Sequence, residues 1–151
     1  MDIKERYLVY QGSIAERYLP AGVKDISYEQ LNTLAHKVLP QRARDFSKLL
    51  DRGIRITTQS GEIVSNPFYF KRVAIKNNIS NWGSCSSLRN INLNMHLVRI
   101  PIPLMNFVIA HELCHLVYPN HGKKFHSLLN LITEGKERYL SRSLDRIKLF
   151  L

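Results

Sequence analysis

The stretch from Ala110 to Phe125 reads AHELCHLVYPNHGKKF and holds three of the six histidines of the chain, together with one glutamate. His111 and His115 are four residues apart. On an α-helix this spacing leaves two side chains about 40° apart in azimuth and one turn apart in height. Both imidazoles can then reach one metal ion, so the stretch predicts a metal-binding helix.

The glutamate of this stretch is Glu112, which follows His111 directly and lies about 100° round the helix from it. That direction suits a general base beside a metal-bound water better than it suits a third ligand. The HExxH pattern arises by chance in roughly one such sequence in a hundred. A carboxylate in an apolar helix is costly unless it has a partner. We therefore predict a catalytic zinc site in which Glu112 is the catalytic residue.

A catalytic zinc ion takes three protein ligands and leaves the fourth position to water. His121 follows His115 beyond a break at Pro119, so the chain can turn and direct this third imidazole back toward the ion. The alternative is Glu134, because in one class of zinc peptidases the third ligand is a glutamate from a later helix. We favour His121, which the short turn keeps close, and expect one Zn²⁺ bound by His111, His115 and His121.

The rest of the chain divides into helical and extended segments by its apolar spacing and its prolines. Ser27 and Gln30 form a capping-box pattern, which predicts a helix that begins at Tyr28. We expect Pro40 to break that helix or to begin a second one. The expected elements are helices up to Gly53, short strands within 53–59 and 65–77, a half-buried strand Asn90 to Leu97, a buried helix from Pro103 to the residue before Pro119, and helices within 122–132 and 134–150.

Composition indicates one soluble globular domain over residues 1–151, with 44% hydrophobic and 23% charged residues. The net charge of +10 favours anionic partners and makes nucleic acid a possible one. It is equally compatible with a solvated basic surface that serves solubility. The sequence does not predict an oligomeric state.

The cellular compartment is predicted from the cysteines and the apolar segments. Cys85 and Cys114 show no paired spacing, so we expect no disulfide and a reducing compartment. The first twenty residues contain no apolar run typical of a secretory signal. The most apolar window, Leu97 to Tyr118, includes charged residues and prolines and is a poor membrane span. We therefore expect a cytoplasmic protein with no membrane partner.

Three motifs in this order resemble the YgjP-like metallopeptidase family: NWGSCSS at 81–87, NINLN at 90–94, and HELCHLVYPNHGKKF at 111–125. The chain is more distantly similar to zinc proteases of the SprT or Spartan type. The resemblance extends over roughly Lys76 to Leu129. It implies an α+β fold, a minimal zincin-like domain with a small, mainly antiparallel sheet packed on an active-site helix and on a backing helix before Gly53.

By this resemblance, His111, His115 and His121 match the zinc ligands of the family and Glu112 its catalytic glutamate. Residues 82–86 match its characteristic loop, which implies a structural or cleft-forming role. The sequence differs from those of metzincins, because Tyr118 stands where they have glycine and no methionine follows His121.

The chain also departs from the family pattern at three places. Asn81 stands where arginine is common, and His126 where an aromatic residue is common. Residues 57–70 contain additional sequence, TTQSGEIVSNPFYF. Such loops shape the cleft while the ligands stay the same, so we expect these differences to affect substrate choice.

These observations predict a zinc-dependent hydrolase, a metallopeptidase that acts on peptides or proteins. A peptide could pair with a sheet edge, for example along Asn90 to Leu97. The candidates for an oxyanion donor are His96, His126, Tyr118 and Tyr139. The competing hypothesis is a basic nucleic-acid-associated module with a structural or vestigial zinc site, or a protease that acts on DNA-bound proteins.

Overall fold

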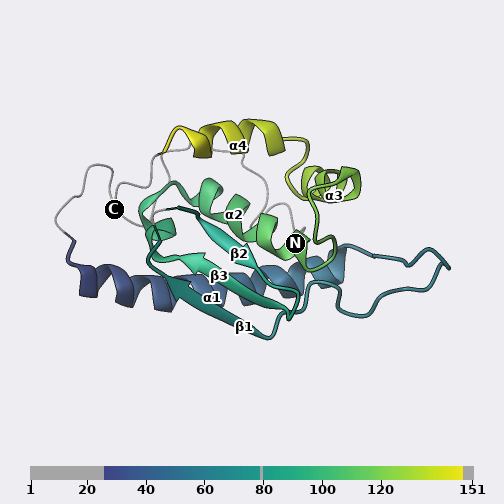
Figure 1. The fold of residues 1–151 in the computed structure, drawn as a ribbon, viewed down its shortest axis with the longest axis horizontal. Helices are drawn as coiled ribbons and strands as arrows, with labels where there is room; N and C mark the ends of the chain where they lie inside the picture. Colours follow the sequence, from purple (N-terminus) through teal and green to yellow (C-terminus); the bar gives the residue numbers. More distant parts are fainter. Residues whose placement is uncertain (1–25, 79, 148–151) are drawn as a thin grey trace.

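The computed structural model describes residues 26–78 and 80–147, and all structural statements concern these ranges. The predicted absence of a secretory signal and the end of the expected last helix, beyond residue 147, lie outside them. The elements follow in the order α1 (Tyr28–Gly53), β1 (Arg72–Lys76), β2 (Gly83–Cys85), β3 (Asn90–Asn94), the 3₁₀ helix η2 (Met95–Arg99), α2 (Ile102–His115), α3 (Lys123–Ile132) and α4 (Glu137–Asp145) (Figure 1).

Helix α1 begins at Tyr28, as the capping box predicts. The Ser27 hydroxyl accepts from the Gln30 N–H at 3.1 Å, and the Gln30 side chain accepts from the Ser27 N–H at 3.1 Å. The expected break at Pro40 is wrong, because α1 continues through it to Gly53. Buried residues recur every three or four positions on both sides of the proline, so packing of this face outweighs the missing hydrogen bond. They are Leu31, Ala35, Leu39, Ala43, Phe46, Ser47 and Leu50.

The α+β class is confirmed, but the sheet is mixed rather than mainly antiparallel. Its order is β1-β3-β2, with β1 parallel and β2 antiparallel to β3. β1 and β2 are consecutive in the chain but lie on opposite sides of β3, so β1 and β3 run in the same direction. β3 is therefore the central strand, and the prediction that its segment offers an edge to a peptide is wrong. Among the described strands, β2 and β1 form the edges.

The alternating segment from Asn90 ends as a strand at Asn94, three residues earlier than expected, and continues as η2. Asn94 causes this change of direction. Its side-chain oxygen accepts from the His96 N–H at 3.0 Å, and its amide donates to the carbonyls of Asn78 and Asn81 at 2.7 and 2.9 Å. A local side-chain bond of this kind competes with the sheet ladder. η2 then packs its buried face toward α1.

The expected strands between α1 and β1 are reduced to one bridge, Thr57 with Ile63. Residues 56–64 form a narrow arm that protrudes from the body (Figure 1). The Val64 N–H donates to the Ile56 carbonyl at 2.9 Å, and the turn passes through Gly61 with a φ of 86°. The additional sequence at 57–70 therefore forms most of this arm and the segment that follows it, and both line a groove with residues 116–118.

Helix α2 lies at the centre of the molecule, between α1 and the sheet on one side and α4 on the other (Figure 1). Its ten residues from Leu104 to Cys114 other than His111 are buried. The backing role expected for the helix before Gly53 is confirmed, because Arg42 of α1 donates to the Asn106 side chain of α2 at 3.0 Å. No helix in the described part of the chain has the length and apolar character needed to cross a membrane.

Candidate metal centre

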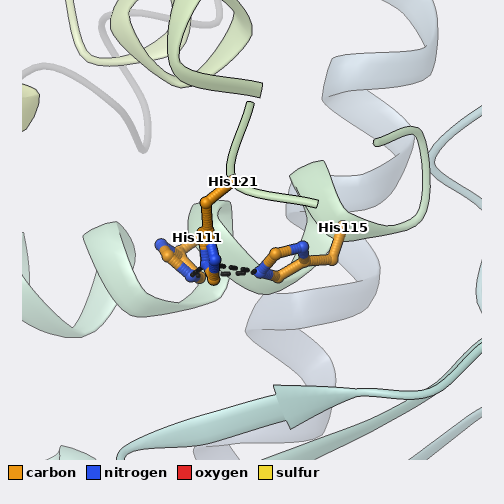
Figure 2. Close-up of side chains that lie close together, drawn as sticks. All are labelled: His111, His115 and His121. Atoms are coloured by element: carbon orange, nitrogen blue, oxygen red, sulfur yellow. Dashed lines mark hydrogen bonds between the residues drawn. The ribbon is translucent and has the colours of Figure 1, made fainter. Parts of the chain in front are cut away.

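Three imidazoles from two neighbouring segments meet at one point (Figure 2). His111 and His115 lie one turn apart at the end of α2, and His121 follows from the turn that leads to α3. Their Nε2 atoms form a triangle with sides of 3.0, 3.1 and 3.2 Å. This is the one group of three or more potential ligands that the described residues bring together.

The shape of this triangle fits a metal ion better than it fits hydrogen bonding. Two nitrogens at about 2.0 to 2.1 Å from a tetrahedral zinc lie about 3.3 Å apart, close to the observed sides. Each Nε2 carries either one N–H or one lone pair, so three such atoms cannot all donate to and accept from one another in a ring. The Nδ1 atom of His115 lies 3.2 Å from the Tyr118 carbonyl and donates to it, which leaves Nε2 as a free lone pair. The residues present fit a bound divalent cation.

Phe125 of α3 packs against all three imidazoles. Its ring is fully buried and stacks on His115, with centroids 4.5 Å apart, and it meets the rings of His111 and His121 edge to face at 4.9 Å. Such contacts restrict the imidazole rotamers before an ion arrives. Sequence reasoning treated Phe125 only as an apolar helix residue. Its position four residues after His121 is the sequence feature that could have predicted a contact with that ligand.

Glu112 is almost completely buried beside the triangle, at 6% exposure. Edge strand β2 lies directly against it: a Cβ added at Gly83 would lie 3.0 Å from Glu112 Oε2 and 3.1 Å from the Asn92 carbonyl. Any larger residue at this position would require Glu112 or the Asn92 carbonyl to move by a few tenths of an ångström. The resemblance implies a structural or cleft-forming role for residues 82–86, but it does not predict that Gly83 lies close to Glu112.

The electrostatics of the site favour neutral imidazoles. Burial, followed by the neighbouring histidines, lowers the pKa of His111 to about 4, and burial also lowers the pKa of His115. Burial raises the pKa of Glu112 to about 8 in the metal-free chain. A divalent cation would oppose that last shift, because it favours a nearby carboxylate. Neutral imidazoles are the form that binds metals.

Other candidate residues lie elsewhere. Glu134 is exposed in the turn after α3, at a φ of 54°, and does not belong to the triangle. His96 is buried in η2, where Nε2 contacts Asn77 Oδ1 at 2.9 Å and Nδ1 contacts Arg99 at 3.4 Å. Burial and then Arg99 lower its pKa to about 4. Both nitrogens have partners away from the site.

Among the candidate oxyanion donors, His126 has a ring close to one of the three imidazoles. Its ring centroid is 6.4 Å from that of His121, and its Nδ1 contacts the Glu137 carboxylate. Tyr118 is held near His115 by its backbone carbonyl, and Tyr139 lies exposed on α4. The structure brings no candidate donor into contact with Glu112.

The two cysteines are free thiols in packed surroundings. Cys114 is fully buried in α2, and burial raises the pKa of its thiol well above the ordinary value. Burial, and then the charge of Glu112, raise the pKa of Cys85 to about 11. Both thiols therefore stay protonated near neutral pH, as expected for packing residues rather than for nucleophiles.

A comparison with protein families matches residues 10–146 to the model described as YgjP-like, metallopeptidase domain. The chain belongs to this family. The match covers most of the sequence and extends well beyond the three motifs at 81–125. Neither the curated proteins nor the solved structures yield a match. The YgjP-like assignment supports a metal-dependent peptidase in general terms, and the His triangle supplies a place for the metal.

Proposed function

We propose that this YgjP-like domain is a zinc-dependent peptidase with its active site at the end of α2. The observation that carries the proposal is the convergence of three Nε2 atoms within 3.2 Å of one another. Glu112, the residue after His111 on the same helix, adds a buried carboxylate. His111, His115 and His121 would hold the zinc ion, which when bound would act as a Lewis acid that polarises the scissile carbonyl and lowers the pKa of a water toward about 7. A closed structural site would not use a base beside a water.

Glu112 performs the proton transfers in this proposal. Its carboxylate accepts a proton from the attacking water and returns it to the leaving amine. Because Glu112 is buried, bulk water has little access to its carboxylate during the proton transfer. The missing side chain of Gly83 lets β2 lie close to this carboxylate. The polarised carbonyl and the base then act on the same peptide bond.

The substrate binds in extended form along β2. This strand is an edge of the described sheet, and its first residue touches Glu112. Backbone pairing with an edge strand holds a peptide with little dependence on its side chains. The scissile bond would thereby lie between the β2 edge and the His triangle.

Hydrolysis in ¹⁸O-labelled water tests the proposed chemistry. Wild type is expected to cleave an unfolded protein or a peptide mixture and to add one labelled oxygen to each new C-terminus. Glu112→Gln, which keeps the shape of the side chain, should bind metal equally and lose cleavage by a factor of at least about 100. Cleavage by Glu112→Gln at the wild-type rate would exclude the glutamate as the base.

A second proposed activity is nucleic-acid binding by α4. Arg138 and Arg142 are exposed one helical turn apart, with Arg146 at the end of the helix, and the whole chain has a net charge of +10. Duplex DNA should then bind with an affinity that falls steeply as salt increases. If no binding occurs at low salt, this second activity is excluded.

A further inference from the structure

A groove of about 640 Å³ lies beside the metal centre, within the volume range of ligand-binding clefts. One wall is the turn that follows α2, from Leu116 to Tyr118. The other lining residues include Ile56 and Val64, at the two ends of the arm, and Pro67, which follows it. The groove is therefore built in part from the additional sequence at 57–70, which the proposed catalytic chemistry does not use.

Two connections place this groove next to the reacting centre. Tyr118, which lines it, accepts a hydrogen bond from His115 through its carbonyl at 3.2 Å. Lys124, which also lines it, lies three residues after His121 and next to Phe125. Successive residues of an extended peptide rise by about 3.3 Å. A side chain two or three residues from the scissile bond can therefore reach the groove.

The charge of the groove is positive. Lys124 and Arg89 line it, and among the residues that the structure describes no acidic side chain does. The Arg89 guanidinium donates to the carbonyls of Tyr69 and Pro67 at 2.8 Å each and to Leu116 at 3.4 Å, so it is fixed by neutral partners. Its charge also acts on Asp51, but that carboxylate accepts from the Phe68 N–H and lines a separate cavity.

We propose that this groove is a specificity subsite that binds a glutamate side chain of the peptide substrate. The apolar walls suit the methylene stem of that side chain, while the exposed Lys124 side chain can reach the carboxylate with its ammonium group. This inference rests on the proposed peptidase function and specifies its substrate class. It assigns a role to the arm, which forms one wall of the subsite.

The test uses peptide binding, so it does not depend on turnover. Fluorescent peptides with blocked ends carry Glu, Gln or Lys at each position in turn, and zinc-loaded Glu112→Gln protein is titrated against them by anisotropy. At one position Glu should bind about three- to tenfold more tightly than Gln, the range for one exposed ion pair with additional burial. A peptide with a free C-terminal carboxylate is compared separately.

Lys124→Glu should reverse this preference in favour of Lys at the same position. Lys123→Glu is the matched control, because Lys123 is the neighbouring exposed residue in the first turn of α3 and does not line the groove. Both changes add an acidic residue near a helix N-terminus, which the helix tolerates. Melting curves establish that both variants fold.

The subsite is excluded if Glu and Gln bind equally at every position, if Lys123→Glu and Lys124→Glu have equal effects, or if only the C-terminal carboxylate matters. Cleavage of the same peptides by wild type separates this inference from the proposed function. A glutamate preference in binding without any cleavage would retain the subsite and exclude the peptidase. Cleavage without a glutamate preference would retain the peptidase and exclude the subsite.

Discussion

Gly83→Ala should damage catalysis without removing the metal. The added methyl carbon would lie 3.0 Å from Glu112 Oε2, 3.1 Å from Glu112 Cγ and 3.1 Å from the Asn92 carbonyl. Carbon atoms in proteins rest at about 3.5 Å or more from such neighbours, so each contact must open by about 0.4 Å. The Asn92 carbonyl belongs to the central strand and can yield little, so the Glu112 side chain has to move.

The expected loss follows from that displacement. A misplacement of about 1 Å at a reacting group can lower a rate about 100-fold, so a shift of about half this size should reduce kcat/KM about tenfold or more. Tenfold corresponds to about 1.4 kcal/mol of transition-state stabilisation. Overpacking should also lower the free energy of unfolding by about 1 to 3 kcal/mol. Metal content should not change, because none of the three nearest atoms belongs to a histidine.

The assay is the initial rate of peptide hydrolysis, measured with metal content on the same preparation. Gly122→Ala is the matched control, since Gly122 precedes α3 beside His121, has a φ of −83°, and leaves a new Cβ with nothing within 4 Å. It should retain wild-type activity. A fully active Gly83→Ala, or an equal loss in both variants, would refute the role assigned to the contact between β2 and Glu112.

Three further predictions concern the ligands and the stability of the fold. Metal analysis should show zinc lost in His121→Ala and kept in Glu134→Ala, and the reverse result would make Glu134 the third ligand. Folding lowers the pKa of His96 from 6.5 to about 4. Between these two pH values the unfolded chain binds more protons than the folded chain, so the free energy of unfolding falls as the pH decreases from 6.5 toward 4. Urea unfolding of metal-free protein at pH 7 and 5 should show a smaller decrease for His96→Gln than for wild type, and equal decreases would contradict this assignment. Ser27→Ala removes a cap and should lower the free energy of unfolding by about 1 kcal/mol in urea, while an unchanged value would mean that α1 does not depend on it.

The features that local sequence predicted well are those with local causes. The start of α1 depends on Ser27 and Gln30, which lie within one turn. The helix of the HExxH motif likewise follows from its apolar spacing, and its two histidines needed only the geometry of one helix. His121 required one further assumption, a short turn after Pro119, and the structure has that turn.

The features that the sequence did not predict depend on distant contacts. Pro40 would end an isolated helix, but the buried face of α1 packs along η2, β1 and α2. The parallel pairing of β1 with β3 depends on β1 and β2 lying on opposite sides of β3, which local sequence does not specify. The approach of Gly83 to Glu112 joins residues 29 positions apart and depends on the packing of β2 against α2.

The most direct test of the central claim is a reconstitution titration of hydrolytic activity. Purified protein is stripped with a chelator, and zinc is returned in steps while the initial rate of peptide cleavage is measured. A site formed by His111, His115 and His121 predicts loss of cleavage on stripping and a linear recovery that levels off at about one zinc per chain. Full cleavage by the stripped protein, or no recovery at any zinc concentration, would contradict a zinc-dependent peptidase.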